Sequence, residues 1–338
     1  MSMADQNAWL KSGAEAALEP DLPILDPHHH LWDHPGTCYL LADILADMGE
    51  GHNIRATVFV ECGSMYRASG PEALRPVGET EFVNGIAAMS ASGGYGATKV
   101  AAGIVGFADL QLGAAVGDVL DAHQRRAPDR FRGIRHAAAH DPSDAIRNGH
   151  TNPPPGLLMD PTFREGFNQL AKRDMSFDAW LYHPQLPDLI DLARSFPDTT
   201  IILDHIGGVL GVGPYAGRAD EIFTDWAQSI TELAQCENVV VKLGGLGMKM
   251  AGRAWHKRPQ PPSSEILAEA WKPYLMHCIE AFGPSRGMFE SNFPVDKASC
   301  GYGVLWNAFK RVAASFSADE KSALFHDTAA RIYRINET

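Results

Sequence analysis

The residues with the clearest capacity for joint chemistry are two histidines near the amino terminus, His28 and His30, in the segment Leu25–Trp32. In an extended chain alternate side chains point to the same side, so these two face one way and His29 faces the other. Two imidazoles that converge in this way can share a metal ion or hold one oxygen of a substrate. A histidine-rich surface turn, or a buried and hydrogen-bonded cluster, would explain an isolated triplet nearly as well.

Two further histidines follow apolar runs that are typical of buried strands. His183 comes directly after Ala179–Tyr182, and His205 comes directly after Ile201–Asp204. Either one alone could be a core histidine bonded to the backbone. Together with the triplet they make three strand-end positions, which favours a shared site. The predicted catalytic and metal-binding histidines are His28, His30, His183 and His205.

The elements that must position these side chains alternate between strand-like and helix-like segments. This alternation runs along most of the chain and is the pattern of repeated βα units around a parallel sheet. The candidate strands are Pro23–Asp26, Arg55–Glu61, Val100–Ala108, Phe131–His136, Phe177–Tyr182, Thr200–Asp204, Asn238–Leu243 and Gly287–Ser291. Eight is the strand number of a (β/α)8 TIM barrel, and the sequence has neither a G-x-G-x-x-G after the first strand nor a P-loop to support an open sheet.

The helix-like segments lie between and after these strands. They are Glu79–Ala91, Ala115–Arg126, Pro161–Arg173, Leu186–Ser195, Asp220–Gln235, Ser264–Phe282 and Tyr302–Ser315. A last stretch, Ser317–Arg334, opens with the capping pattern Ser-Ala-Asp-Glu and is expected to pack outside the barrel. We expect a single barrel domain over residues 21–338, with long strand-to-helix loops that form the active-site face, after an amino-terminal extension over residues 1–20.

The composition narrows the class of protein. The chain has 338 residues, of which 45% are hydrophobic and 21% charged, as is ordinary for a folded globular protein. Its formal net charge of -12 argues against nucleic acid and anionic membrane surfaces as partners. The five cysteines include no C-x-x-C pair, and the first residues lack the apolar core of a signal peptide. We therefore expect a cytoplasmic protein with reduced thiols.

Several segments together resemble the amidohydrolase superfamily. They are the HxH motif that ends the first strand, the histidines after the fifth and sixth strands, and Ser291–Pro294 after the last strand. From about Pro23 onward the chain is similar above all to the amidohydrolase-2 family of metal-dependent barrel hydrolases, a branch rich in lactonases. The other matching segments are Val105–Leu110, Phe131–His136, Gln185–Leu189 and Val241–Leu246. The resemblance implies hydrolysis of a lactone, by water that attacks a carbonyl polarised by the histidines or by their metal ion.

One position departs from the family pattern and leaves the proton acceptor open. The family usually ends its last strand in Ser-Asp-Trp-Pro, whose aspartate binds metal or activates water, whereas this chain has Asn292 in that place. An amide cannot act as a general base. Glu290 would share a face with Asn292 in an extended strand and is the preferred replacement, and Asp296 and Glu61 are the alternatives. The catalytic candidates in this region are Glu290, Asn292 and Asp296.

A second group of residues is predicted to contact the substrate. Arg135 and Lys242 would project toward the same mouth, where each could bind a carboxylate or pair with a neighbouring acid. A positive group at the pocket of a net-acidic protein suggests an anionic small molecule. The complete set of substrate-binding candidates is Glu61, Arg135, His136, Lys242 and Trp255.

Three functions are compatible with these residues. Lactone hydrolysis is favoured by the resemblance, and a non-oxidative decarboxylase comes second, because relatives on the same barrel use similar histidines to bind a metal and an aromatic acid. A catalytically impaired, ligand-binding relative comes third, because Asn292 replaces the usual aspartate. The site is expected to hold one zinc or manganese ion, since imidazole and carboxylate suit both, or to work without metal. A homodimer is a further possibility.

Overall fold

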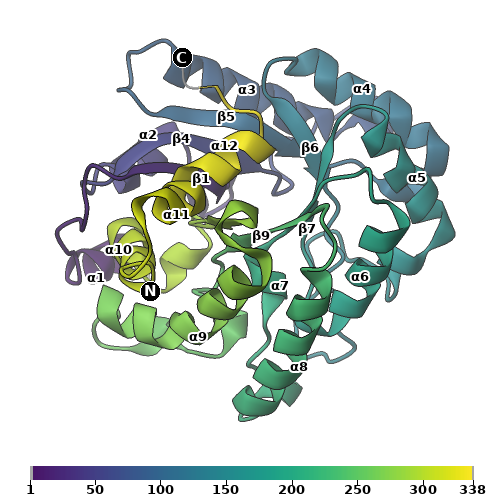
Figure 1. Cartoon of the computed structure of the whole chain (residues 1–338). Coiled ribbons are helices and arrows are strands. Elements are labelled where there is room, and N and C mark those ends of the chain that lie inside the picture. Colours follow the sequence, from purple (N-terminus) through teal and green to yellow (C-terminus); the bar gives the residue numbers. More distant parts are fainter. Residues whose placement is uncertain (1–2, 337–338) are drawn as a thin grey trace.

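Eight parallel strands nearly close into a barrel in the computed structural model, which describes residues 3–336 (Figure 1). The strands follow one another in chain order: β1 (Pro23–His29), β4 (Asn53–Val60), β5 (Lys99–Gly106), β6 (Phe131–Arg135), β7 (Ser176–Ala179), β8 (Ile201–Leu203), β9 (Val239–Leu243) and β10 (Gly287–Phe289). Just after β10, the Asn292 amide donates to the His28 carbonyl over 2.9 Å and the His30 amide donates to the Phe293 carbonyl over 2.8 Å. These bonds join the last strand to the first, and the predicted (β/α)8 TIM barrel is confirmed.

Helices return the chain between strands and surround the barrel (Figure 1). The predicted ones correspond to α3 (Val77–Ala91), α4 (Val116–Arg126), α5 (Pro161–Ala171), α6 (Leu186–Ser195), α8 (Ala219–Leu233), α9 (Ser264–Phe282) and α10 (Tyr302–Val312). The others are α1 (Met3–Lys11), α2 (Leu41–Met48), α7 (His205–Gly208), α11 (Ala318–Ser322) and α12 (Thr328–Ile332), with a π-turn over Ala323–Asp327. Within residues 3–336, no helix has the length and apolar character that crossing a membrane requires.

Local sequence signals set where several of these helices begin. The Asp160 carboxylate accepts a hydrogen bond from the Phe163 amide over 2.8 Å, and Pro161 occupies the first position of α5, where no amide hydrogen is needed. At α11 the Ser317 hydroxyl and the Glu320 carboxylate form the reciprocal capping box that the sequence predicts.

The sequence missed a short antiparallel hairpin directly after the histidine triplet. Its strands, β2 (Trp32–His34) and β3 (Thr37–Tyr39), have three residues each, too few to show a hydrophobic period. The turn between them contains Pro35 and Gly36, whose φ of 83° suits glycine. The hairpin brings Trp32 and His34 to the mouth of the barrel.

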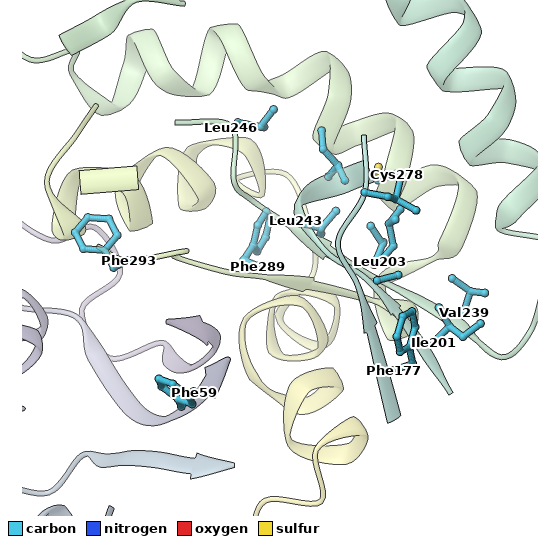
Figure 2. Close-up of a cluster of buried hydrophobic side chains, with 14 of the residues drawn as sticks. Phe59, Phe177, Ile201, Leu203, Val239, Leu243, Leu246, Cys278, Phe289 and Phe293 are labelled. Atoms are coloured by element: carbon cyan, nitrogen blue, oxygen red, sulfur yellow. The ribbon is translucent and has the colours of Figure 1, made fainter. Parts of the chain in front are cut away.

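The alternation of side chains along the strands separates two apolar cores. Ile201 and Leu203 of β8 point outward and pack under the surrounding helices with Val239 and Leu243 of β9 (Figure 2). Ile202 points the other way, into the barrel. Charged or polar residues that lie two positions beyond an inward-facing residue must therefore also point inward, near the carboxyl ends of the strands.

The end of the chain closes the opposite end of the barrel. Tyr333 and Ile335 pack with Leu25 and Val58 inside the barrel, and α12 contacts β1 and β10 (Figure 1). The prediction that Ser317–Arg334 packs outside the barrel is therefore wrong for its last residues. The apolar interior at the amino-terminal end of the strands needs a cover, and these side chains supply it.

The amino-terminal extension packs against the outer helices. The Lys310 ammonium of α10 donates to the carbonyls of Leu18 and Glu19 over 2.7 and 2.9 Å. The Glu15 carboxylate accepts a hydrogen bond from the Ser264 amide at the start of α9 over 2.7 Å. These contacts anchor the extension to the barrel.

A glycine in α5 gives a direct test of the helix packing. A Cβ at Gly166 would lie 2.1 Å from the Leu110 carbonyl oxygen, whereas a Cβ at Gly85 in α3 would meet nothing within 4 Å. We expect Gly166→Ala to lower the free energy of unfolding by about 1–3 kcal/mol through overpacking. The matched variant Gly85→Ala should raise it by about 0.5–1 kcal/mol, since alanine favours a helix. Urea denaturation measures both, and unchanged stability in Gly166→Ala would contradict the packing described.

Candidate active site

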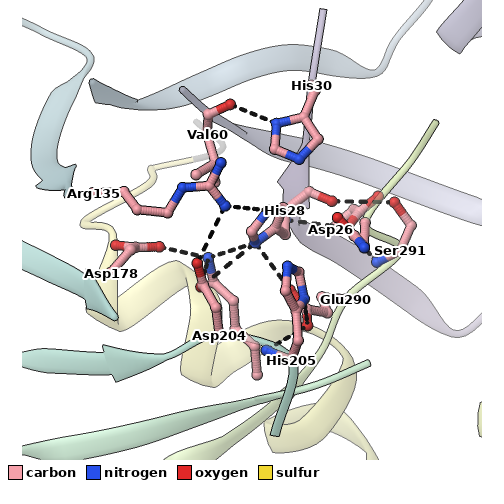
Figure 3. Close-up of polar contacts among 12 residues, drawn as sticks. Asp26, His28, His30, Val60, Arg135, Asp178, Asp204, His205, Glu290 and Ser291 are labelled. Carbon is pink, nitrogen blue, oxygen red and sulfur yellow. Dashed lines mark hydrogen bonds and ion pairs between the residues drawn. The ribbon is translucent and has the colours of Figure 1, made fainter. Parts of the chain in front are cut away.

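The site lies inside the carboxyl-terminal end of the barrel, where inward-facing polar residues of several strands meet (Figure 3). Because side chains alternate between the two faces of a strand, Asp204 points inward like Ile202 two positions before it, and Glu290 points inward like Met288. His28 lies at the centre of this group, with Arg135 and Asp204 to one side and Glu290 and His205 to the other (Figure 3). The cluster is almost completely buried.

Glu290 holds two histidines at once. Its Oε1 lies 2.6 Å from His205 Nδ1, and its Oε2 lies 3.0 Å from His28 Nδ1. Burial alone would raise the pKa of this carboxyl, but His205 and His28 outweigh burial and lower the pKa to about 2. An ionised carboxylate only accepts hydrogen bonds, so Glu290 fixes a proton on Nδ1 of His205 and leaves the lone pair on its Nε2. His28 Nδ1 lies between Glu290 and the Lys242 ammonium, which is 3.1 Å away and can only donate.

A backbone carbonyl likewise determines which ring nitrogen of His30 carries the proton. Its Nδ1 lies 2.8 Å from the Val60 carbonyl oxygen, which can only accept, so Nδ1 carries the proton here as well. Burial and the neighbouring His28 lower the pKa of His30 well below its usual range. Burial and Lys242 likewise lower the pKa of His28. Both rings are therefore neutral near pH 7, as metal-binding or hydrogen-bond-accepting imidazoles must be.

Backbone strain accompanies this arrangement. His205 and Asn292 have left-handed φ angles of 55° and 54°, which cost about 1–3 kcal/mol for residues other than glycine. The His205 amide donates to Glu290 Oε1 over 3.1 Å, and the Asn292 amide donates to the His28 carbonyl over 2.9 Å. The hydrogen bonds that orient the rings thus also hold the strained backbone.

Two buried cations pair with carboxylates around His28. Lys242 Nζ lies 2.5 Å from Asp178 Oδ2, 3.0 Å from Asp204 Oδ1 and 3.1 Å from His28 Nδ1. Arg135 Nη1 lies 3.4 Å from both His28 Nε2 and Asp204 Oδ2. Burial would raise the pKa of Asp204, but Lys242 and His28 hold it well below its usual range. Asp204 is therefore ionised.

Arg135 is also paired on its other side with Glu61. Arg135 Nε donates to Glu61 Oε1 over 2.7 Å, and Nη2 donates to the Glu61 carbonyl over 2.5 Å. Burial would raise the pKa of Glu61, but His150 and Arg135 lower it to about 2. His150 reaches Glu61 Oε2 from a different loop, with its Nε2 2.9 Å away.

The cluster has the donors and the charge to hold a divalent cation. One ligand atom from each of His28, Asp204 and His205 lies within 4.8 Å of the others. Asp204 Oδ1 is buried and accepts no hydrogen bond from the described residues, although Lys242 Nζ is 3.0 Å away. Four buried carboxylates of the cluster, Glu61, Asp178, Asp204 and Glu290, face the two buried cations Arg135 and Lys242, and a divalent ion would offset part of this negative charge.

Asn292 and Asp296 form a separate pair at the edge of the cluster. Asn292 Nδ2 donates to Asp296 Oδ1 over 2.9 Å, and the Gly247 amide donates to Asp296 Oδ2 over 2.9 Å. Burial raises the pKa of Asp296 to about 7. Asn292 lines the cavity, but Asp296 lies behind it.

A cavity of about 810 Å³ opens above the cluster. His30, His205, Arg135 and Asn292 contribute to its lining, so the buried cluster is accessible from this side. Its wall combines aromatic side chains, Trp32, Trp180 and Tyr182, with the cationic side chains Arg147 and Lys249. Among residues 3–336, neither an aspartate nor a glutamate lines the cavity.

The remaining candidates lie away from this cavity. His183 contacts Tyr215 at a separate hollow, and its Nδ1 lies 3.3 Å from the Leu210 amide. His136 packs between Phe107 and Phe163. Trp255 stacks on Trp271 in the core beneath α9. The structure thus brings His28, His30 and His205 together but leaves His183, His136 and Trp255 outside the cavity.

Lys242 and Glu290 occupy positions different from those the sequence suggested. Lys242 lies beneath His28, fully buried among carboxylates, and so is not available to a substrate in the cavity. Glu290 is fully buried with both oxygens close to histidines, which makes it a positioning residue and not the water-activating base favoured from the sequence. Glu61 is likewise buried and lies behind Arg135.

Sequence reasoning missed four residues of the site: Asp178, Asp204, His150 and Trp180. The alternation rule could have found Asp204, because it is two positions beyond the inward-facing Ile202. It could also have found Asp178, one residue after the outward-facing Phe177. No local pattern indicates His150, because its place depends on how the loop after β6 folds back over the barrel.

A parallel barrel with a histidine and carboxylate cluster at the carboxyl ends of its strands is the arrangement of a barrel enzyme. A family model described as amidohydrolase matches residues 25–335. The chain belongs to the amidohydrolase family and is an enzyme of the amidohydrolase type, as the sequence predicts.

Three relatives illustrate this membership. The uncharacterized protein y4mH of Sinorhizobium fredii is 36% identical over 343 residues, which cover 93% of this chain and 99% of that protein. L-fucono-1,5-lactonase of Burkholderia multivorans is 26% identical over 325 residues, 93% of this chain and 96% of the lactonase. A crystal structure of a Burkholderia multivorans amidohydrolase with bound zinc has a TM-score of 0.69 and 25% identity, and it covers 93% of this chain and 99% of that one.

The proposed ligand set predicts how zinc binding depends on Asp204. We expect Asp204→Asn to weaken zinc binding at least about tenfold, because it removes the one anionic donor of the group. Calorimetric titration of chelator-treated protein gives the affinity and the stoichiometry. The control is Asp109→Asn, because the Asp109 side chain is 45% exposed and lies outside the cluster. This variant should bind zinc as the natural protein does. Equal zinc affinity in Asp204→Asn and the natural protein would exclude Asp204 as a ligand.

Proposed function

We propose that the protein hydrolyses a small lactone that carries a carboxylate, in the cavity above His28 and His205. The observation that carries the proposal is the lining of that cavity, to which the described residues contribute three cationic side chains, Arg135, Arg147 and Lys249, and no acidic one, in a protein of net charge -12. Such a pocket attracts an anion and holds it against the histidines of the floor.

Hydrolysis of an ester is supported by the floor of the cavity. His30 and His205 line this floor, and imidazoles suit either a metal ion or a polarised oxygen. Two of the relatives with detectable sequence identity are named L-fucono-1,5-lactonase, which supports a cyclic ester as the substrate class. The negative charge of the substrate is proposed from this chain's own cavity.

The residues at the floor would bind the lactone group. Arg135, fixed by Glu61, can donate from Nη1 to the carbonyl oxygen and stabilise the negative charge that forms there. His28, Asp204 and His205 would hold the divalent ion, which we propose to be zinc and which would polarise the carbonyl as a Lewis acid. Trp180, whose ring packs edge-on against His205, orients that imidazole.

The residues at the rim would bind the remainder of the substrate. Arg147 and Lys249 are exposed, and neither forms an ion pair with a described residue, so both can receive a carboxylate. Trp32 and Tyr182 provide apolar surface for the ring. This division places the reacting ester at the floor and the charged group at the mouth.

A panel of lactones tests the reaction. We expect ring opening, detected as proton release with a pH indicator, for lactones that bear a carboxylate, and a lower kcat/KM for neutral lactones of the same ring size. Aromatic acids should release no carbon dioxide, which a decarboxylase on this barrel would produce. Release of carbon dioxide, or the absence of any ring opening across the panel, would contradict the proposed reaction.

Arg147→Gln and Lys249→Gln test the charge of the substrate. Each should raise KM for the anionic lactone about tenfold, because each removes one charged hydrogen bond, and should leave kcat nearly unchanged. Lys257→Gln is the control, since Lys257 is an exposed cation of the same loop region outside the cavity. An equal rise in KM for neutral lactones would show that these two side chains do not recognise the carboxylate.

A further inference from the structure

The cavity lacks an obvious acceptor for the proton of the attacking water. No carboxylate of the described residues lines it, and Asn292, which does, carries an amide that cannot accept the proton. Glu290 and Asp204 lie beneath the floor, where both are in contact with buried histidines or cations. The acceptor must therefore be sought among the histidines of the wall.

Four histidines line the cavity: His30, His34, His150 and His205. His30 and His205 belong to the floor cluster, and their Nδ1 atoms are held by Val60 and Glu290. His34 stacks near Trp32 and makes no ion pair with a carboxylate of the described residues. His150 differs from all three, because its partner is Glu61. Among the described residues His30 and His34 pair with no carboxylate, and Glu290, the partner of His205, also contacts His28.

We propose that His150, oriented by the buried Glu61, is the acid–base residue of this site. The inference rests on the proposed hydrolysis and adds the group that moves the proton. His150 Nε2 lies 2.9 Å from Glu61 Oε2, and the Glu61 side chain is fully buried. A carboxylate accepts, so Nε2 carries the hydrogen and Nδ1 keeps the lone pair that can take a proton.

The loop that carries His150 is tied down on both sides of it. The Gly149 amide donates to the Ala139 carbonyl over 2.7 Å, and the Thr151 hydroxyl donates to the Ala137 carbonyl over 3.1 Å. Both acceptors belong to the segment that continues from β6. His150 is thus held in place on the cavity wall, with about a third of its side chain exposed.

Glu61 also fixes the distance between the base and the group that binds the carbonyl. Its Oε1 accepts from Arg135 Nε over 2.7 Å, while its Oε2 pairs with His150. One buried carboxylate therefore holds both the cation proposed for the ester oxygen and the imidazole proposed for the water, and both side chains line the cavity. Glu61 itself is a positioning residue, because it is buried behind both side chains.

The reaction balances with these groups alone. His150 Nδ1 takes a proton from water as the water oxygen forms a bond to the lactone carbonyl carbon, and the charge on the carbonyl oxygen lies next to Arg135. The bond from that carbon to the ring oxygen then breaks, and the ring oxygen receives the proton from His150. One water is consumed and one hydroxy acid is formed, which ionises and releases a proton to solvent.

Removal of the imidazole, followed by its replacement from solution, tests this role. His150→Ala should lower kcat at least about 100-fold with little change in KM, and added imidazole should restore part of the activity in proportion to its concentration. His150→Gln should show the same loss without rescue, because its amide fills the space and cannot accept the proton. His326→Ala removes an imidazole paired with Asp327 on the outer surface, and it should keep full activity and not respond to imidazole.

The outcomes separate this inference from the proposed function. Natural protein that opens no lactone of the panel would overturn both. Active natural protein together with fully active His150→Ala would overturn only the role of His150. A loss of activity in His150→Ala that imidazole does not restore, in a variant with the melting temperature of the natural protein, would also overturn it and would assign His150 to binding or loop structure.

Discussion

One buried carboxylate orients the two histidines on which the rest of the site depends. Glu290 places one oxygen 2.6 Å from His205 Nδ1 and the other 3.0 Å from His28 Nδ1. It also accepts the amide of His205, whose backbone is strained. Because Glu290 contacts the Nδ1 atom of both rings, the Nε2 atom of each ring points away from Glu290. This orientation determines which ring atoms face a metal ion or a substrate oxygen.

Burying the carboxylates of the cluster costs free energy, and neighbouring cations offset part of that cost. Burying charges is unfavourable unless each finds a partner, and Lys242 and Arg135 supply the partners for Asp178, Asp204 and Glu61. The same chain of contacts extends through Glu61 to His150 on the cavity wall. Floor and wall are therefore one connected network, and a change at Glu61 would be felt on both sides of the cavity.

The sequence predicted the barrel well because eight apolar strands leave a strong local signal. It predicted the site less well, for reasons that differ between residues. His28 and His205 follow from strand ends, whereas His183 also ends an apolar run but turns into a separate hollow after β7. Glu290 was expected to activate water, yet the alternation that turns it inward buries it below the histidines. His150 depends on a loop fold that no period in the sequence encodes.

The central claim is that Glu290 fixes the proton on Nδ1 of His205. Correlation spectra of ¹⁵N-labelled imidazoles report which ring nitrogen carries hydrogen, and His205→Gln assigns the signal. In metal-free protein at pH 8 the account predicts a protonated Nδ1 and a bare Nε2 for this ring. A proton on Nε2 with a bare Nδ1 would contradict it, because Glu290 could not then be the partner that orients His205.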